Sequence, residues 1–493
     1  MLRLFKTQSG YITVYLTLTF AIILSLLLAL VEGAAMGAAR LQAELVADLG
    51  MDSIFAEYHR ELFSQYGLLF VDDSYGTKKG SLSKVEKHLA EYMSYNMKPE
   101  KGLVLAPGSH WIPLENTHLE IEEAAFATDD SGKVWKAQAV DYMKSKYGMD
   151  IIQGIQDQLQ TIEQTKMLSI DVQKNLSEYK KAFEESLANK EITETYQKTQ
   201  EGFSYDLIRD FLDQFAGKGI LYLAVSDSDS LSSAVMKRKE CLSYRVQQGN
   251  VNKGSGLPEY VDKPQGLVNE LLFDEFLLQK YGFYGQEKEN SHLKYQAEYI
   301  LYGRDNDISN LRESAERLLW LRSAANYIYL TTKDAAKIKE VELIAMAICT
   351  LLGIPKAAEV LSMLIILLWV MAESTYDVKC LLQGGEVPLI KNKGDWMLSL
   401  TGLFQGELWK KGANTTGMSG MTYEEYLRVF LALMLNQESK VMRSMDIAEL
   451  DIRKTAGNEN FRIDQCVDYL KVTFGFIGDR GQEYVFTRTM RYE

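Results

Sequence analysis

The longest unbroken apolar stretch of the chain lies near its N-terminus. No charged residue occurs between Thr7 and Val31, and leucine, isoleucine, valine and phenylalanine dominate this run. A bilayer hydrocarbon core about 30 Å thick is crossed by roughly 20 helical residues, because each residue adds about 1.5 Å. We therefore predict a transmembrane anchor helix over residues 11–36.

The charges around this run predict its orientation and processing. Arg3 and Lys6 precede the run, and the next basic residue after it is Arg40, which favours a cytoplasmic N-terminus. We expect 1–10 to lie in the cytoplasm and 37–493 outside it. An uncleaved signal anchor is the favoured interpretation, because the run exceeds the roughly 7–15 apolar residues of a secretory signal. A cleaved signal peptide is an alternative.

Small residues mark the end of the predicted anchor. Gly33 and Gly37 are spaced as G-x-x-x-G, and Ala34 and Ala38 repeat this spacing one position later. Small side chains at such spacing let a second helix approach closely in lipid, so a homodimer or a pilus-type helix bundle is one interpretation. The alternative interpretation is an unpartnered helix end.

Helical periodicity continues beyond the anchor. Leucines recur every four residues from Leu41 to Leu49, and apolar residues keep a helical spacing up to Tyr66. This pattern predicts that the spanning helix continues into a long helix of the extracytoplasmic domain. Gly50 is a candidate bend, and Gly67 is a candidate helix end, because glycine readily adopts the left-handed conformation that terminates helices.

The rest of the chain mixes helical and strand-like patterns without a βαβ rhythm. Helical hairpins are predicted near 150–190 and 341–372, and a long helix over Asp305–Leu330. Strands are predicted at Leu68–Val71, Leu119–Glu122, Ile220–Val225 and Tyr295–Tyr302, and a C-terminal β-hairpin over 461–492. These elements predict a helix-rich α+β fold, with a mixed or antiparallel sheet and helical insertions.

The second helical hairpin contains two apolar runs. Leu343–Ile354 and Val360–Ala372 are each shorter than the roughly 17 residues that a membrane span requires. One span across both runs would place Lys356 and Glu359 in lipid, at about 2.5–3.5 kcal/mol for the lysine alone. We therefore predict a buried hairpin, and a hairpin that dips into the membrane is the alternative.

Composition narrows the partners and the redox chemistry. The chain has 493 residues, is 46% hydrophobic and carries a net charge of −13, which favours a folded body and disfavours nucleic acid as a partner. Its four cysteines match no zinc-binding spacing; they are Cys241, Cys349, Cys380 and Cys466. Cys349 lies in an apolar run and is predicted to be a buried thiol, whereas a Cys380–Cys466 disulfide is left open.

No sequence motif indicates a catalytic reaction. The 5 histidines form no H-E-x-x-H pattern or Cys/His cluster, and the chain has no phosphate-binding glycine loop or G-x-S-x-G elbow. We therefore predict no catalytic residues, no cofactor and no metal site, and a protein that is not an enzyme. A tethered enzyme with an unrecognised site is an alternative.

Several segments resemble an uncharacterised bacterial membrane family. They are Gly10–Leu16, Val31–Ala34 and Glu57–Phe63, followed by Glu298–Gly303, 310–312 and 318–322. Members of that family resemble TadE/TadG-type minor pilins and are associated with tight-adherence (Flp-type) pilus and secretion systems. The resemblance implies Gly10 as a prepilin-type processing position, although Tyr15 stands where processed pilins usually carry glutamate.

These observations predict a single-pass protein of the cell membrane with a structural or assembly role, pilin-like or accessory to a Tad-type system. Its expected partners are the lipid bilayer, other envelope or pilus proteins, and a second copy bound through the anchor helix. A membrane-anchored adhesin or receptor is the alternative function.

Overall fold

The computed structural model describes residues 8–97, 112–146, 150–188, 219–225, 231–247, 266–404 and 419–492. The chain divides into two compact units. The first unit comprises Met1–Trp135, Gln247–Val261 and Gly457–Glu493, and the second comprises Lys136–Val246 and Asp262–Ala456. The fold is helix-rich α+β, and its only sheet among the described residues lies in the first unit.

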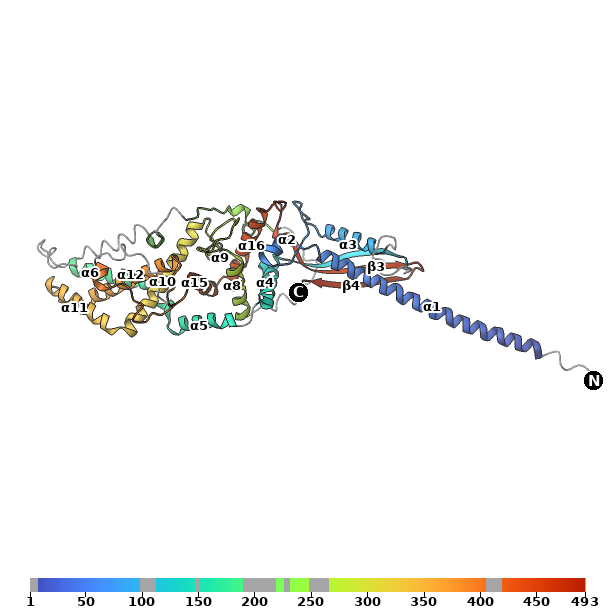
Figure 1. Ribbon diagram of the computed structural model, residues 1–493, viewed down its shortest axis with the longest axis horizontal. Coiled ribbons are helices and arrows are strands. Elements are labelled where there is room, and N and C mark those ends of the chain that lie inside the picture. The colour runs from blue at the N-terminus through green and yellow to red at the C-terminus, as the bar shows by residue number, and fades with distance from the viewer. Residues whose placement is uncertain are drawn as a thin grey trace, which may run out of the picture. The chain divides into compact units, whose positions relative to one another are not determined.

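Helix α1 spans Gln8–Phe55 and opens the first unit (Figure 1). It continues through Gly50, the candidate bend, as one uninterrupted helix. A Cβ atom at Gly50 would lie 2.9 Å from the Leu89 Cδ1 and 3.2 Å from the Met93 Cγ. The glycine therefore allows helix α3, Leu82–Met97, to pack closely against α1.

The predicted helical periodicity up to Tyr66 belongs to two helices rather than one. Helix α1 ends at Phe55, and the short helix α2 covers Arg60–Tyr66. His59 caps α2, because its Nδ1 accepts a hydrogen bond from the Leu62 backbone N–H at 3.2 Å. Gly67, with φ of 75°, ends α2 as predicted, and its N–H donates to the Phe63 carbonyl.

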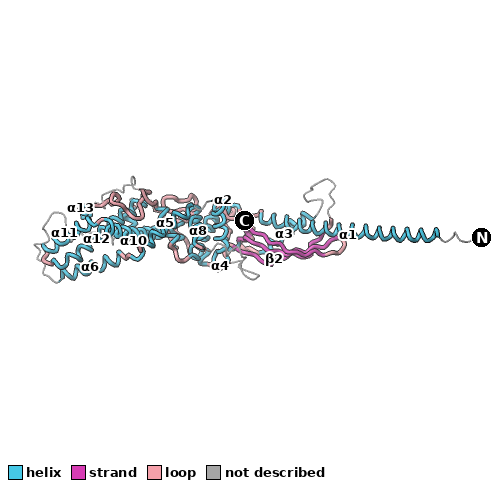
Figure 2. The backbone as a smooth tube through the Cα atoms, turned by 90° about the horizontal axis from the view of Figure 1, so that it is seen from below, coloured by secondary structure: helices cyan, strands magenta, loops and turns pink. Residues whose placement is uncertain are grey.

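A small antiparallel sheet forms the other half of the first unit (Figure 2). The central strand is β3, Cys466–Gly478. Strand β2, Leu114–Phe126, pairs along one side of β3, and β4, Glu483–Arg491, pairs along the other. Strand β1, Val71–Asp72, pairs with the start of β3 and is shorter than predicted.

The described residues of the second unit form helices joined by loops, with isolated β-bridges and no sheet strand. Helix α4, Asp129–Lys146, begins in the first unit and continues into the second. The other helices are α5 (Asp150–Gln164), α6 (Val172–Ala188), α8 (Leu267–Lys280), α9 (Gln296–Tyr302), α10 (Asp307–Lys333), α11 (Ala335–Leu351), α12 (Ala358–Leu382), α13 (Leu400–Phe404), α15 (Tyr423–Ala432) and α16 (Gln437–Arg453). Short 3₁₀ helices cover Met167–Ser169, Arg238–Glu240, Leu242–Tyr244, Pro355–Ala357 and, in the first unit, Ile463–Gln465.

Helix α12 is the core of the second unit. It is apolar and long enough to cross a membrane, but 83% of its most hydropathic window is buried by the protein itself. Helices α6, α10 and α11 surround it. Neighbouring helices therefore bury the second apolar run, as the buried-hairpin interpretation expects. The first run lies in α11 and is buried on one face only, since Leu343, Met346 and Leu351 are each more than half exposed.

Two predicted strands are wrong, and one predicted helix is confirmed. Residues 296–302 form helix α9, and residues 219–224 are also helical. Six consecutive residues of α9, from Gln296 to Leu301, are buried, the polar Gln296 and Glu298 among them, so burial follows no helical period that the sequence could show. The long helix predicted over Asp305–Leu330 is confirmed as α10.

All four cysteines are buried free thiols. The Cys380–Cys466 disulfide, left open by the sequence, is therefore not formed. The predicted burial of Cys349 is confirmed, and burial raises the pKa of this thiol to about 11.

Candidate functional site

The first half of α1 is an exposed apolar rod. From Tyr11 to Val31 every side chain except the half-buried Thr19 is exposed. The most hydropathic window of the helix has a mean hydropathy of 2.6, and none of it is buried. Large apolar surfaces of this kind mark sites that another phase or molecule covers.

The second half of α1 packs into the core of the first unit. Its buried apolar side chains include three alanines at four-residue spacing; they are Ala39, Ala43, Val46, Ala47, Met51, Ile54 and Phe55. They share one hydrophobic cluster with Phe474 and Phe476 of β3 and with Leu89 of α3. Because alanine adds little bulk, the helix backbone approaches its neighbours closely at these positions.

A second apolar stripe runs along the opposite side of the same helix. It consists of Ala34, Ala38, Leu41, Leu45 and Leu49, and we call it the α1 stripe. At about 100° per residue these positions lie on one face. The three leucines are 60%, 48% and 43% exposed, in chain order. The α1 stripe therefore extends the exposed apolar surface well beyond Val31.

Strand β4 runs alongside α1 in the same direction and contacts the helix at three successive positions. The Tyr484 hydroxyl donates to the Met36 carbonyl at 3.3 Å. Further along, the Arg488 guanidinium pairs with Asp48 at 2.7 Å. At the end of the strand the Tyr492 hydroxyl donates to the Phe55 carbonyl at 2.6 Å. These contacts fix the orientation of α1 relative to the sheet.

The turn between β3 and β4 reaches the end of the apolar rod. Arg480 in this turn pairs with Glu32 of α1, with 3.6 Å between Nη1 and Oε1. Glu32 directly follows Val31 and is the first charged residue after the rod. The two side chains are 53% and 54% exposed.

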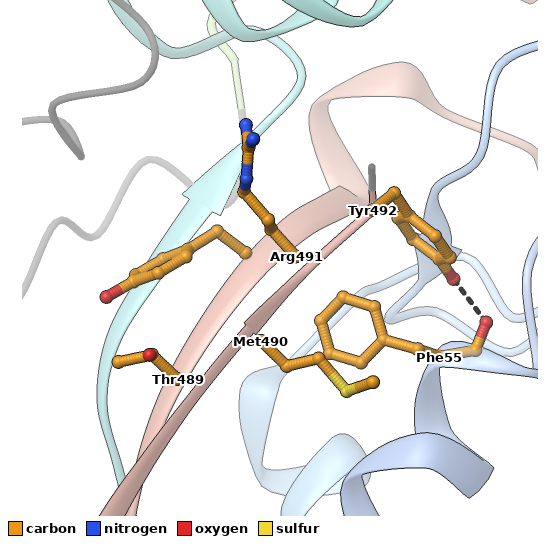
Figure 3. Close-up of a pocket in the computed structure, with 6 residues that line it drawn as sticks. Phe55, Thr489, Met490, Arg491 and Tyr492 are labelled. Atoms are coloured by element: carbon orange, nitrogen blue, oxygen red, sulfur yellow. Dashed lines mark hydrogen bonds between the residues drawn. The ribbon is translucent and has the colours of Figure 1, made fainter.

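A hollow of about 590 Å³ lies at the other end of β4 (Figure 3). It is lined by Phe55, Tyr469, Thr489, Met490, Arg491 and Tyr492. The Phe55 and Tyr492 rings pack with centroids 4.9 Å apart. Burial raises the pKa of both tyrosines. The hollow is open and holds no acid–base pair, so it offers a surface contact and no recognisable catalytic arrangement.

The predicted packing residues lie on exposed surface. Gly33 and Gly37 are exposed, and a Cβ atom at either would meet no other atom within 4 Å. Ala34 and Ala38 are exposed as well. Gly10 lies within α1, whereas Arg3 and Lys6, on which the predicted orientation depends, lie outside the described residues.

Two histidines of the first unit, His59 and His88, make structural contacts. His59 caps α2, and its Nε2 lies 3.1 Å from the Asn458 side-chain oxygen; burial lowers the pKa of His59. His88 lies 3.3 Å from Glu57. Among the described residues, no group of three or more histidine, cysteine, aspartate or glutamate side chains is arranged to hold a metal ion.

Sequence reasoning missed a buried ionic network in the second unit. Arg322 and Asp377 pair at 3.0 Å, and Lys391 pairs with Asp377 at 2.6 Å and also with Glu373. All four side chains are completely buried. Arg322, Asp377 and Lys391 are far apart in the sequence, so their spacing could not predict that they form a network. Every charge has an opposite partner, which is typical of a structural network.

Comparison with known families finds a match over the C-terminal part of the chain. The model described as "Family of unknown function (DUF5702)" matches residues 197–477, which is more than half of the chain. The match covers most of the second unit and strand β3, and it does not include α1. Neither a curated protein nor a solved structure matches the chain.

Proposed function

The chain belongs to a family of unknown function, DUF5702, and we propose that it is a single-pass membrane protein with a structural or assembly role. In this proposal residues 11–36 anchor it in the cell membrane, with the N-terminus in the cytoplasm and the folded units outside. The protein acts through contacts with other proteins and catalyses no reaction. A pilin-like or accessory part in a Tad-type system is the assembly that its sequence resembles.

The exposed apolar rod is the observation that carries the anchor. At roughly −0.3 to −0.6 kcal/mol for each central leucine, isoleucine, valine or phenylalanine, membrane insertion of the rod is favourable by several kcal/mol. In water the same surface would remain uncovered, since residues 11–31 are exposed in the folded protein. Helix α12, the other apolar candidate, already has protein neighbours.

The α1 stripe supports the role in assembly. It continues from the small residues at the membrane edge to Leu49, on the side of α1 that faces away from its own sheet. Small residues at the membrane edge and leucines beyond it suit one occupant, another helix that also emerges from the membrane. We propose an anchored partner helix at this stripe, from another envelope protein or from a second copy.

Charge substitution in the rod tests the anchor. Two arginines near its centre, Ile23→Arg with Leu27→Arg, cost about 5–7 kcal/mol and offset most of the insertion energy. We expect the variant to lose membrane association after alkaline extraction, whereas Leu435→Arg in the second unit should remain in the pellet. Leu435 is 98% exposed, which makes it a control for the added charge. A wild-type chain that is extracted into the supernatant contradicts the proposal.

Crosslinking tests the assembly face. A cysteine at Leu45, in the α1 stripe, should form a crosslink to a neighbouring anchored protein in intact membranes. A cysteine at Arg40, an exposed position on another face of the same helix, is the matched control and should crosslink several-fold less. Equal yields at the two positions would count against the stripe as a docking face.

A further inference from the structure

The β3–β4 turn, residues 478–482, has a defined height along α1. Strand β4 runs parallel to the helix, and the helix partners of Tyr484, Arg488 and Tyr492 appear in the same order along α1. From Tyr484 to Tyr492 the strand covers about 26 Å at 3.3 Å per residue. From Met36 to Phe55 the helix covers about 28 Å at 1.5 Å per residue. Because these two lengths agree, β4 and this part of α1 lie side by side over their whole length.

This alignment places the turn where the apolar rod ends. Arg480 lies beside Glu32, one position after Val31. The turn is an ordered structure, since the Gly478 N–H donates to the Gln482 carbonyl at 3.0 Å and the Gly481 N–H donates to the Gly478 carbonyl at 2.8 Å. If the rod fills the hydrocarbon core, residues 32–36 and the turn occupy the layer just outside it.

The chemistry of the turn suits headgroups that carry both charges. Arg480 offers a guanidinium to a phosphate, and its carboxylate partner is Glu32. Asp479 in the same turn and Glu483 at the start of β4 are also exposed. The excess of negative charge disfavours anionic lipids. The ammonium group of a zwitterionic lipid has acidic partners here, while its phosphate has Arg480.

We infer that the β3–β4 turn is a lipid-contact surface that rests in the headgroup layer of zwitterionic phospholipids. The inference rests on the membrane anchor proposed above and adds which face of the first unit meets the bilayer. The end of the sheet that carries the β3–β4 turn therefore faces the membrane, and the strands run along the direction of the anchor helix.

Fluorescence quenching in vesicles tests this contact. Full-length protein carrying Asp479→Cys or Thr489→Cys is labelled with a fluorophore and reconstituted into vesicles of phosphatidylethanolamine and phosphatidylcholine. Both sites are exposed, and the unmodified protein, with four buried cysteines, gives the labelling background. Thr489 lies about 20 Å further along β4 than Glu483. Quenching by a headgroup-attached nitroxide should be several-fold stronger at position 479.

The outcomes separate the anchor from the lipid contact. Equal quenching at both positions in protein that stays with the vesicles overturns the lipid contact and leaves the anchor intact. Protein that does not stay with the vesicles overturns the anchor itself. Arg480→Gln should weaken quenching at position 479, and vesicles of phosphatidylglycerol should weaken it as well; unchanged quenching in both tests contradicts the headgroup chemistry.

Discussion

Arg322 and Asp377 form a salt bridge in the interior of the second unit, and neither side chain is accessible to solvent. The Arg322 Nη1 also donates to the Pro388 and Leu389 carbonyls, each at 2.8 Å, and to the Tyr426 hydroxyl at 2.9 Å. The guanidinium thus ties α10 to α12, to the segment after α12 and to α15. A charge held this way stabilises only while its partner remains.

Removal of one partner should therefore be costly. We expect Asp377→Ala to lower the free energy of unfolding of the second unit by about 3–5 kcal/mol, because Arg322 loses a buried counter-charge. Urea denaturation followed by tryptophan fluorescence measures this, since Trp369 and Trp396 lie in the same unit. The control is Glu313→Ala, which breaks the exposed Arg304–Glu313 pair and should cost at most about 1 kcal/mol.

Glu298 predicts a pH dependence of stability. It is fully buried, and burial raises its pKa to about 7, although hydrogen bonds from the Tyr284 N–H and the Tyr423 hydroxyl oppose the shift. The folded state therefore binds a proton more tightly than the unfolded state, whose glutamate has a pKa near 4.5. This contribution is fully present below pH 4.5 and is lost as pH rises through 7.

Substitution at this position isolates the effect. Glu298→Gln should be more stable relative to wild type at pH 8 than at pH 5, because glutamine needs no proton to remain neutral. Tyr423→Phe removes a donor that lowers the pKa of Glu298, so this variant should move the loss of stability to higher pH. Thermal unfolding at both pH values measures each shift. A difference between Glu298→Gln and wild type that is independent of pH contradicts the assignment.

Gly50 should tolerate no large side chain. Gly50→Leu places its side chain against Leu89 and Met93, and overpacking of this kind costs about 1–3 kcal/mol. Hydrogen exchange of α3 amides should rise accordingly. Gly154→Leu in α5 is the matched control, since a Cβ there meets nothing within 4 Å and helix propensity favours leucine by about 0.5–1 kcal/mol. Similar exchange in both variants would show that α1 and α3 have room to separate.

The four buried thiols predict resistance to modification. Burial raises the pKa of Cys241 to about 12 and that of Cys380 to about 11, so little reactive thiolate is present at neutral pH. We expect a maleimide to label the folded protein slowly and to label four cysteines after denaturation. Mass spectrometry without reduction reads the count directly. Fewer than four labelled thiols after denaturation would reveal a disulfide.

The sequence locates the rod but not the way in which α1 packs. The apolar run from Thr7 to Val31 has no interruption, and a run of that length allows few structures. Beyond it, α1 carries two stripes: leucines at 41, 45 and 49, and alanines at 39, 43 and 47. The smaller residues turn out to be buried. The alanine face is the buried one because small side chains let the helix backbone lie close to the sheet. The sheet strands are distant in sequence, so the local pattern of α1 does not reveal this contact.

Contacts distant in sequence explain the other differences. Residues 296–302, predicted as part of a strand, form α9, which packs against α10 and α16. Tertiary burial on all sides removes the helical period that sequence reasoning relies on. The network around Arg322 joins side chains separated by up to 104 positions, so it becomes visible only in the folded structure.

The sheet register has a consequence for biogenesis. Phe126 of β2 pairs with Val467 of β3, and the intervening chain contains the whole second unit. A ribosome adds roughly 5–20 residues each second, so β3 is synthesised on the order of 20–70 seconds after β2. During that interval the edge of β2 has no partner strand, while the rest of the chain is still being synthesised. Any product that stops before β3 therefore lacks the central strand of its sheet, and we expect quality-control proteases to remove it.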